Sequence, residues 1–210
     1  MGLVETIRAY QKNDPAARSG LEVFLLYNGL HATLIYRAAH WLHLHKLQFL
    51  ARLLSQLAKW FTGVEIHPAA TIGRRLVIDH GTGIVIGATT QIGDDCLLYQ
   101  GVTLGGTGIA TGKRHPTLGN NIMVGSGAKI LGPIRIGDNA RVAANSVVLR
   151  DVPENSTVVG VPGRVVRLGG EKLDHVHTPD PVALELQALR DRLLELEKRI
   201  QRKDDDHVSV

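Results

Sequence analysis

An aliphatic residue recurs at every sixth position across the middle of this chain, from about Val64 to Val166. A period of six fits neither the 3.6-residue turn of a helix nor the alternation of a simple strand. It suits a chain that turns a corner every six residues and points one aliphatic side chain per side into a triangular prism. Parallel β-helices built from hexapeptide repeats have this arrangement. The recurring positions are Ile66, Ile72, Ile78, Ile84, Ile86, Ile92, Leu98, Leu104, Leu118, Val124, Ile130, Ile136, Val142 and Val148.

Six glycines directly follow such a position, and we expect them at the corners of the prism, where the backbone needs relaxed steric limits. A glycine-rich loop region is the alternative, but it would not keep fourteen aliphatic positions in three phased runs. The pattern therefore predicts a β-helix. The six are Gly73, Gly87, Gly93, Gly119, Gly125 and Gly137.

The period is interrupted twice. It slips by two residues between Ile84 and Ile86, and it stops between Leu104 and Leu118. The second gap holds a glycine-rich insert, residues 105–117, which carries Arg114 and His115 and has no part in the repeat. Because loops that leave a rigid scaffold commonly carry function, we expect this insert to belong to a functional site.

Residues 1–62 lack the period and predict an N-terminal helical domain before the β-helix domain of residues 63–168. Asp14 followed by Pro15 predicts a helix start with the aspartate as N-cap. Gly29 is expected to bend or divide the helical region, and Thr62-Gly63 to end it. Four histidines in this region have no accompanying carboxylate, so we interpret them as solvated or capping groups rather than metal ligands. They are His31, His40, His43 and His45.

Residues 169–210 form a third region, which begins with a linker rich in Gly, Pro, His and Asp. Apolar residues then follow at spacings of four and three, which predicts the a/d seam of a heptad helix. Because the seam is short, we expect it to associate only where the β-helix already brings subunits together; a helix packed on its own domain is the alternative. The seam consists of Val182, Leu186, Leu189, Leu193, Leu196 and Ile200.

The composition excludes several classes of protein. Apolar residues at 44% and charged residues at 21% are typical of a folded globular chain. A formal charge of +4 is too small to predict nucleic-acid binding. Cys96 is the single cysteine, so no disulfide is expected, and we interpret it as a buried small hydrophobe. No apolar run reaches the length of a membrane span, so we expect a cytoplasmic protein without a membrane partner.

Asp79 and His80 stand out, because small residues would serve the corner after Ile78 better. An imidazole beside a carboxylate is the usual arrangement of a general base. Glu65 lies fifteen residues earlier, close to one coil of eighteen, so we expect it beside His80 on a successive coil. No hydroxyl or thiol stands out as a nucleophile. This favours direct activation of a substrate hydroxyl or of water over a covalent intermediate.

Several motifs together resemble those of the serine O-acetyltransferases, over roughly residues 10 to 168. The resemblance implies a mainly β fold, a left-handed parallel β-helix with an N-terminal helical domain, and active sites between the subunits of a homotrimer. It also implies acetyl transfer from acetyl-CoA to the L-serine hydroxyl, the first committed step of cysteine synthesis. The motifs are residues 65–70 (EIHPAA), 79–83 (DHGTG), 100–108 (QGVTLGGTG), 114–116 (RHP), 125–132 (GSGAKILG) and 160–164 (GVPGR), of which the last two occur throughout hexapeptide acyltransferases.

The resemblance also implies roles for single residues. His80 matches the catalytic base, and Glu65 stands where the family has the aspartate that orients it. Arg114 matches the residue that clamps the serine carboxylate, with His115 beside it in the pocket. Asp14 and Asp79 match acids that contact serine, and Gly106 matches a pocket glycine whose N–H can hold the thioester oxygen.

For the coenzyme, acetyl-CoA is the implied co-substrate, and no metal or prosthetic group is implied. Ser126, Gly127, Ala144 and Thr157 match positions along the coenzyme groove. Arg141 and Arg164 are candidates to meet its phosphates, with a solvated face of the prism as the alternative.

The chain departs from the long members of the family at both ends. Those members use extra N-terminal helices to pair trimers into hexamers, so here we expect a homotrimer, with a higher oligomer as the alternative. Their tail ends in an isoleucine that inserts into the sulfhydrylase that follows in the pathway. Because this chain ends Ser209-Val210, we do not expect that complex.

Three other functions are alternatives to serine acetylation. Another small alcohol, such as homoserine, a sugar or a xenobiotic, could accept the acetyl group, although Asp14, Asp79 and Arg114 favour a zwitterionic amino acid. A zinc carbonic anhydrase on the same coil needs three histidines, and Asn120 stands where a third is expected. A catalytically silent scaffold would not require the Asp-His and Arg-His pairs.

Overall fold

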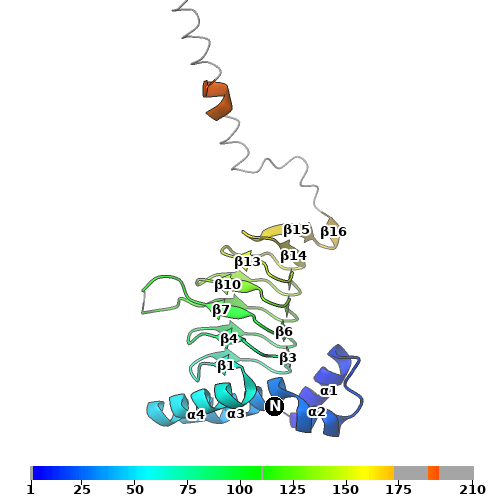
Figure 1. Cartoon of the computed structure of the whole chain (residues 1–210), viewed down its shortest axis with the longest axis vertical. Helices are drawn as coiled ribbons and strands as arrows, with labels where there is room; N and C mark the ends of the chain where they lie inside the picture. The colour runs from blue at the N-terminus through cyan, green and yellow to red at the C-terminus, as the bar shows by residue number, and fades with distance from the viewer. Residues whose placement is uncertain (1, 110, 173–188, 194–210) are drawn as a thin grey trace, which may run out of the picture. The chain divides into compact units, whose positions relative to one another are not determined.

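The computed structural model describes residues 2–109, 111–172 and 189–193. By their contacts, the residues divide into two units, Met1–Leu173 and Asp174–Val210. The first unit is a parallel β-helix with helices at its N-terminal end (Figure 1), which confirms the predicted fold class.

Strands β1 to β14 pair in parallel in three sheets that the chain visits in turn, so these sheets are the three faces of a prism. Face 1 contains β1 (Glu65–Ile66), β4 (Val85–Ile86), β7 (Thr103–Gly105), β10 (Lys129–Leu131) and β13 (Val147–Val148). Face 2 contains β2 (Thr71–Ile72), β5 (Gln91–Ile92), β8 (Thr117–Leu118) and β11 (Arg135–Ile136). Face 3 contains β3 (Val77–Asp79), β6 (Leu97–Tyr99), β9 (Met123–Val124), β12 (Arg141–Val142), β14 (Ser156–Val159), β15 (Arg164–Leu168) and β16 (Glu171–Lys172).

Three edges join the faces and are named here by the faces they join. Edge 1/2 comprises residues 67–70, 87–90, 106–116, 132–134 and 149–151. Edge 2/3 comprises residues 73–76, 93–96, 119–122, 137–140 and 153–155. Edge 3/1 comprises residues 80–84, 100–102, 125–128 and 143–146.

The core is the column of aliphatic side chains inside the prism. All fourteen recurring positions belong to it, and all are buried except Ile72, which is half-buried. Equivalent positions stack directly, as Ile66 on Ile86 and Ile86 on Leu104. Removal of this continuous apolar surface from water stabilises each coil through its neighbours rather than alone.

The repeat glycines have a different purpose from the one predicted. None of the six has a positive φ; instead, each lies where the next coil comes too close for a side chain. A Cβ on Gly93 would lie 2.5 Å from the Gly119 carbonyl oxygen, and one on Gly137 would lie 2.4 Å from the Glu154 nitrogen. The expectation of relaxed backbone torsions at these positions is therefore wrong, because contact between coils is what excludes a larger residue.

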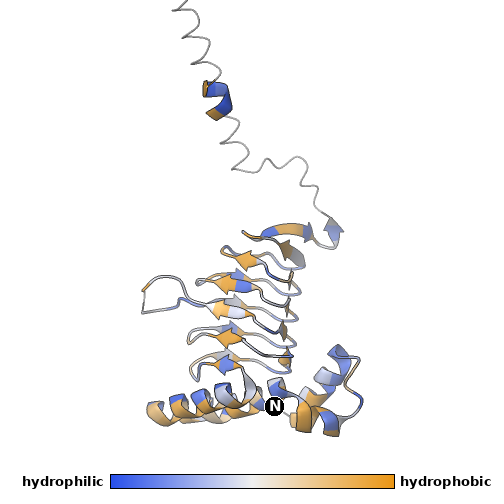
Figure 2. Cartoon of the chain, viewed as in Figure 1, coloured by the Kyte–Doolittle hydropathy of each residue, from blue (hydrophilic) through white to orange (hydrophobic). Residues whose placement is uncertain are grey.

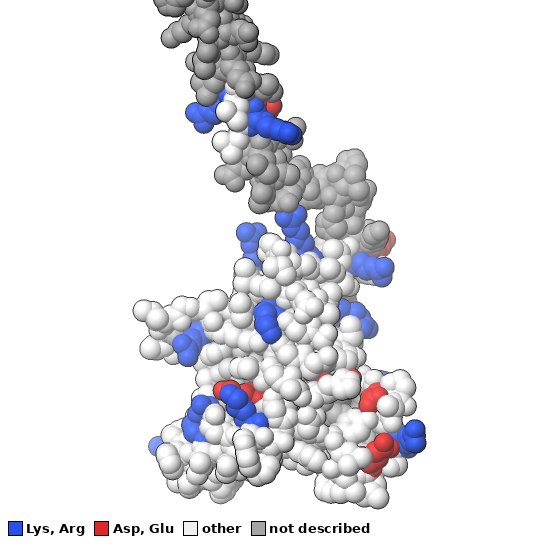
Figure 3. All heavy atoms as spheres, viewed as in Figure 1, with Lys and Arg blue, Asp and Glu red and all other residues white. Residues whose placement is uncertain are grey.

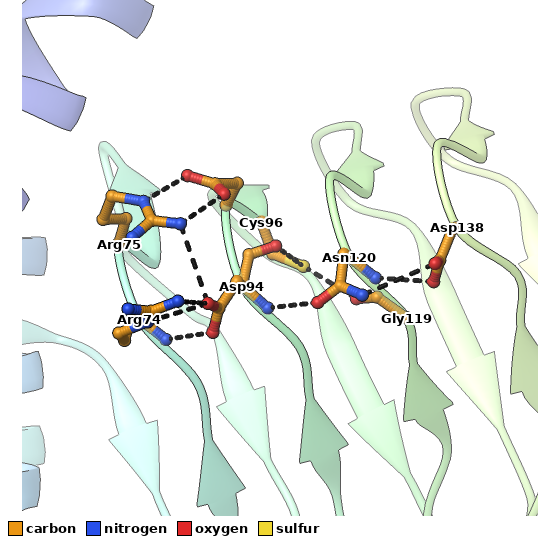
Figure 4. A network of polar contacts seen from close by, with 8 residues as sticks. Arg74, Arg75, Asp94, Cys96, Gly119, Asn120 and Asp138 are labelled. Atoms are coloured by element: carbon orange, nitrogen blue, oxygen red, sulfur yellow. Dashed lines mark hydrogen bonds and ion pairs between the residues drawn. The ribbon is translucent and has the colours of Figure 1, made fainter.

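At edge 2/3, left-handed torsions fall on polar residues that stack from coil to coil, including Asp95, Asn121 and Asn139. Asn side chains tolerate this conformation because they hydrogen-bond locally. Beside them runs a polar ladder in which Asp94 accepts from Arg74 and Asn120 is paired with Asp138 (Figure 4).

Cys96 lies within this ladder, where its thiol donates to the Gly119 carbonyl at 3.3 Å (Figure 4). The side chain is buried, and burial raises the thiol pKa to about 11. Its interpretation as a buried small residue is confirmed.

The two-residue slip in the period lies at edge 3/1. Glu65 pairs with Val85, 20 residues on, whereas Val85 pairs with Thr103, 18 residues on. The first coil takes five residues, 80–84, to turn from β3 to β4, and the second takes three, 100–102. The slip therefore enlarges the corner that begins with His80.

Four helices precede the coil: α1 (Leu3–Asn13), α2 (Gly20–Leu26), α3 (Asn28–Leu44) and α4 (Gln48–Thr62). The predicted N-cap at Asp14 is wrong, because Asp14 ends α1 and Ser19 caps α2 through a hydrogen bond from the Glu22 N–H. The break expected at Gly29 falls earlier, between α2 and α3. Gly29 instead allows close contact with the coil, since a Cβ there would lie 2.1 Å from the Ile78 oxygen.

The helices cover the open end of the first coil, where backbone groups have no neighbouring strand. Side chains of the helical segment bond to these groups instead, which satisfies polar atoms that burial would otherwise penalise. The Tyr10 hydroxyl accepts from the Ile78 N–H at 3.1 Å, Tyr36 donates to Ala70 O at 2.6 Å, Ser55 donates to Ile66 O at 2.8 Å, and His40 Nδ1 lies 2.7 Å from Pro68 O. His40 is thus a capping histidine.

Helix α4 packs on the coil through small residues, Ala51, Ser55 and Ala58, and exposes its large apolar ones. Figure 2 shows hydrophobic residues along α3 and α4 at this end of the prism. No helix in the described part of the chain is both long enough and apolar enough to cross a membrane.

At the other end, β15 turns back and pairs antiparallel with β14, and β16 pairs antiparallel with β15. In the second unit, residues 189–193 are helical and Leu189 and Leu193 are exposed. The remaining positions of the predicted heptad seam lie outside the described residues.

Candidate active site

Both interruptions of the six-residue period carry polar clusters. The enlarged corner of edge 3/1 carries the His80 cluster, defined here as Asp14, Tyr27, Asp79 and His80. The insert of edge 1/2 carries the His115 cluster, defined here as Thr89, Arg114 and His115.

His80 is held by its backbone while its ring points to solvent. Its φ of 57° is unusual for a residue other than Gly or Asn. The Asn28 side chain, at the start of α3, donates to His80 O at 2.9 Å and to Thr62 O at 3.0 Å. The His80 side chain is 76% exposed, so the fixed corner presents an imidazole that can reach a substrate.

Two carboxylates lie near this imidazole. Asp79 Oδ1 is 3.9 Å from His80 Nε2, which is an ion-pair distance rather than a hydrogen bond. Asp14 Oδ2 accepts from the Tyr27 hydroxyl, and Asp14 Oδ1 accepts from the Ala16 N–H at 2.8 Å. These hydrogen bonds hold the pKa of Asp14 below its usual value, with a smaller contribution from His80. Asp14 is therefore an oriented, ionised acceptor close to His80.

In the His115 cluster, Thr89 contacts both functional residues. Its Oγ1 accepts from the backbone N–H groups of Arg114 and His115, each at 3.1 Å, and lies 2.8 Å from His115 Nδ1. Lys113 secures the same turn by donating to Thr89 O at 2.6 Å. The insert is thus fixed at the base that carries Arg114 and His115.

Two glycines make room for this cluster. The His115 ring lies over Gly87, where a Cβ would be 1.9 Å from Cδ2. Gly106 lies against the Arg114 side chain, with its Cβ position 3.1 Å from Cγ. The predicted pocket residues Gly106, Arg114 and His115 are therefore neighbours.

Glu65 is not placed as expected. Register pairs Asp79 with Tyr99 and Glu65 with Val85, so Glu65 and His80 lie on the same coil rather than on successive ones. Glu65 Oε2 accepts from Lys59 Nζ at 2.6 Å on face 1. Its role as the orienting acid of His80 stays a prediction.

His67 lies at the base of edge 1/2. Its Nδ1 accepts from the Ala69 N–H at 3.0 Å. Burial, and then the nearby Arg52 guanidinium, lower its pKa to about 4, with smaller effects from His43 and His115. The ring is therefore neutral and serves as an acceptor.

The residues predicted for the coenzyme lie further along the prism. Edge 3/1 continues from the His80 corner through backbone hydrogen bonds from Gly101 to Thr82, from Gly127 to Gln100 and from Asn145 to Ser126. Ser126, Gly127 and Ala144 lie on this edge, and Arg141 pairs with Thr157 on the adjoining face 3. Arg164 lies on β15 opposite Val159. Gly127 is tightly packed, because a Cβ there would lie 2.2 Å from Asn145 Oδ1, whereas Arg141 is exposed.

The two clusters lie on different edges. One side of the prism spans about six residues, or roughly 15–20 Å at the rise of a strand. A molecule the size of an amino acid cannot bridge that distance across one chain. Basic side chains on the face shown in Figure 3 are scattered rather than gathered into one patch.

Sequence reasoning missed Asn28, Tyr27 and Thr89. Tyr27 separates α2 from α3, and Asn28 begins α3. Asn is a residue typical of turns, so this position could have been recognised as a break in the helical region. Nothing in the sequence distinguishes Thr89 from the other Ser and Thr residues, which are frequent at the corners of the repeat.

Asn120, weighed as the site of a missing zinc ligand, belongs to the ladder of edge 2/3. In residues 2–109, 111–172 and 189–193, no three His, Cys, Asp or Glu side chains are grouped to hold a metal ion.

The chain is similar to known proteins over most of its length. Residues 115–150 match the family described as bacterial transferase hexapeptide (six repeats). A serine acetyltransferase of Synechococcus elongatus is 54% identical over 202 residues, which cover 95% of this chain and 83% of that protein.

Two solved structures share the fold. The serine acetyltransferase of Neisseria gonorrhoeae in complex with serine has a TM-score of 0.76 and 42% identity, and covers 79% of this chain and 67% of its own. The enzyme of Brucella abortus in complex with coenzyme A has a TM-score of 0.77 and 41% identity, over 78% of this chain. This chain spans 66% of the Brucella chain.

Proposed function

The chain belongs to the serine acetyltransferase family, and we propose that it transfers the acetyl group of acetyl-CoA to the hydroxyl of L-serine. The products are O-acetyl-L-serine, the activated intermediate of cysteine synthesis, and free coenzyme A. One observation carries the proposal: the two interruptions of the repeat hold a carboxylate–imidazole cluster and an arginine–imidazole cluster, which the prism itself does not need.

In the proposed reaction His80 is the general base in a complex that holds both substrates. The imidazole takes the proton of the serine hydroxyl, and the oxygen attacks the acetyl carbonyl. As the tetrahedral intermediate collapses, the C–S bond breaks, and the imidazolium gives its proton to the departing thiolate. General-base assistance contributes about 10²–10⁴-fold to such reactions.

The charged groups match the two ends of an amino acid. Arg114 is proposed to hold the serine carboxylate through its two parallel N–H donors. Asp14 and Asp79 are proposed to receive the ammonium group; the low pKa of Asp14 keeps its charge. These opposite charges favour serine or homoserine over a sugar, which has neither a carboxylate nor an ammonium group.

Glu65, on face 1, is proposed to complete the site as the acid that orients a His80 imidazole, with His115 as the donor beside Arg114. The coenzyme is proposed to lie along edge 3/1, beside Ser126, Gly127 and Ala144. Gly106 would supply an N–H to the thioester oxygen. Exposed Arg141, with Thr157 and Arg164, would contact the phosphate end.

We propose a homotrimer whose sites lie between chains. The separation of the two clusters on different edges supports this, because a serine-sized molecule needs both within reach. The reaction is assigned to the cytoplasm, where acetyl-CoA and serine are available.

The test is release of coenzyme A thiol from acetyl-CoA with L-serine, L-homoserine or a hexose as acceptor. We expect activity with L-serine, and a loss of 10²–10⁴-fold in His80→Gln with an unchanged thermal unfolding temperature. Activity with another acceptor but not serine would reject the substrate assignment. Near-normal turnover in His80→Gln would reject the base.

A further inference from the structure

The hydrogen bonds of Thr89 determine where the protons of the His115 cluster lie. Thr89 Oγ1 accepts from two N–H groups, those of Arg114 and His115, and so uses both of its acceptor positions. The single hydroxyl hydrogen is left for the third neighbour, His115 Nδ1, at 2.8 Å.

A second donor points to the same ring nitrogen. The Thr89 backbone N–H donates to His115 Nδ1 at 3.2 Å. A nitrogen that accepts from both an N–H and an O–H cannot carry a proton itself. The neutral His115 ring therefore has its proton on Nε2.

The other ring nitrogen, Nε2, forms no hydrogen bond within the described residues and is not fully buried. It lies close to Gly87, where a Cβ would be 2.2 Å from it. The ring is fixed in this orientation from below, because it lies over Gly87 with no space for a Cβ. His115 as a whole is only 7% exposed, so Nε2–H is a donor held in a fixed position on a mostly buried ring.

We propose that Thr89 is a positioning residue, which sets the tautomer of His115 and aligns it with Arg114 so that the pair presents N–H donors to the carboxylate of the substrate. This inference rests on the proposed function for the identity of the substrate. The two imidazoles then have different roles. His80 takes the proton of the serine hydroxyl, and His115 donates a hydrogen bond to the substrate carboxylate.

The electrostatics agree with a neutral ring. Burial, and then the charges of Arg114 and Lys113, lower the pKa of His115. A neutral ring with one fixed proton can be a donor without adding a second base to the site.

The variants are Thr89→Val, which keeps the shape of the side chain and removes the hydroxyl, and Thr89→Ser, which keeps the hydroxyl. The matched control is Thr90→Val, because the adjacent Thr90 hydroxyl is buried and has no hydrogen-bond partner in the described chain. All three are compared with the wild-type full-length protein, and thermal unfolding is measured for each.

The first measurement is independent of activity. Spectra of protein with ¹⁵N-labelled histidine, with His115 assigned by its loss in His115→Gln, report which ring nitrogen carries the proton. We expect the Nε2–H form in the wild type, Thr89→Ser and Thr90→Val, and a mixture in Thr89→Val. A His115 protonated on Nδ1 in the wild type would overturn the inference, whatever the substrate.

The second measurement is kinetic. Hydrogen bonds to charged groups are strong enough that Thr89→Val should raise KM for L-serine about 10- to 100-fold, with a smaller change in kcat. Thr89→Ser should restore KM, and Thr90→Val should leave it unchanged. An unchanged KM in Thr89→Val, or equal losses in Thr89→Val and Thr90→Val, would overturn the positioning role. If serine is inert but the Nε2–H form is lost only in Thr89→Val, the tautomer assignment stands and the proposed function fails.

Discussion

The position of Gly87 has no space for a side chain, because the His115 ring of the insert lies over it. A methyl group there would lie 1.9 Å from the His115 ring, so the ring must move and Arg114 with it. Displacements of about 1 Å in a site cost on the order of 10²-fold in rate. We expect Gly87→Ala to lower kcat/KM for serine by about 10- to 100-fold in the thiol-release assay.

Gly112 provides the control for that substitution. It lies in the same insert, but a Cβ there meets no atom within 4 Å. Gly112→Ala should keep wild-type kcat/KM. Equal losses in the two variants would show that the insert responds to any added methyl group rather than to the His115 contact.

His67 makes stability depend on pH. Its pKa of about 4 in the folded chain lies below the ordinary 6.5, so the unfolded chain binds the proton more tightly. The stability it contributes is complete above pH 6.5 and is lost as pH falls from 6.5 towards 4. Urea unfolding at pH 7 and pH 5 should therefore show a smaller pH-dependent loss in His67→Gln than in the wild type. His45→Gln, at an exposed histidine, serves as control, and an identical loss in all three proteins would contradict the assignment.

Some single residues were predictable and others were not. Asp79, His80, Arg114 and His115 are chemical groups that the repeat does not explain, so the residues themselves indicated them, whereas Asp14 was indicated only by the family resemblance. The glycines were found for the wrong reason, because contact between coils depends on residues 17 to 28 positions away. Asn28 and Thr89 act through neighbours that only the folded chain supplies.

The N-terminal helices stabilise the fold because their side chains satisfy the unpaired backbone groups of the first coil. Tyr10 is fully buried, and its hydroxyl accepts from Ile78 of β3. Tyr10→Phe leaves that N–H without a partner, at a cost of about 1–3 kcal/mol. The melting temperature should fall by a few degrees. Tyr99→Phe, whose hydroxyl makes no hydrogen bond in the described chain, should not change it; equal shifts would exclude the capping role.

The sequence predicts the strands well and the helix boundaries less well. In a regular six-residue period any irregularity is visible in the sequence. The two-residue slip falls at the corner that carries His80. Asp14-Pro15 misled because an aspartate before proline can end one helix as readily as it starts another. Here Asp14 ends α1, and its carboxylate accepts a hydrogen bond from the Tyr27 hydroxyl.

For the whole molecule, the proposed sites between chains have a direct consequence. His80→Gln damages one cluster and Arg114→Ala the other, so each homotrimer should be inactive. In trimers assembled from an equal mixture, about a quarter of the sites should combine two intact clusters. Thiol release should return to about that fraction of the wild-type rate when the variants are co-expressed. No recovery in proven mixed trimers would place both clusters of one site in the same chain.

The antiparallel return of β15 onto β14 has a consequence for solubility. A bare final coil would offer its free N–H and C=O groups as a template, and prisms could then polymerise end to end into fibres. A turned-back strand disrupts that template at one end, as the helices do at the other. We therefore expect the prisms not to join end to end, although each coil within them pairs with the next.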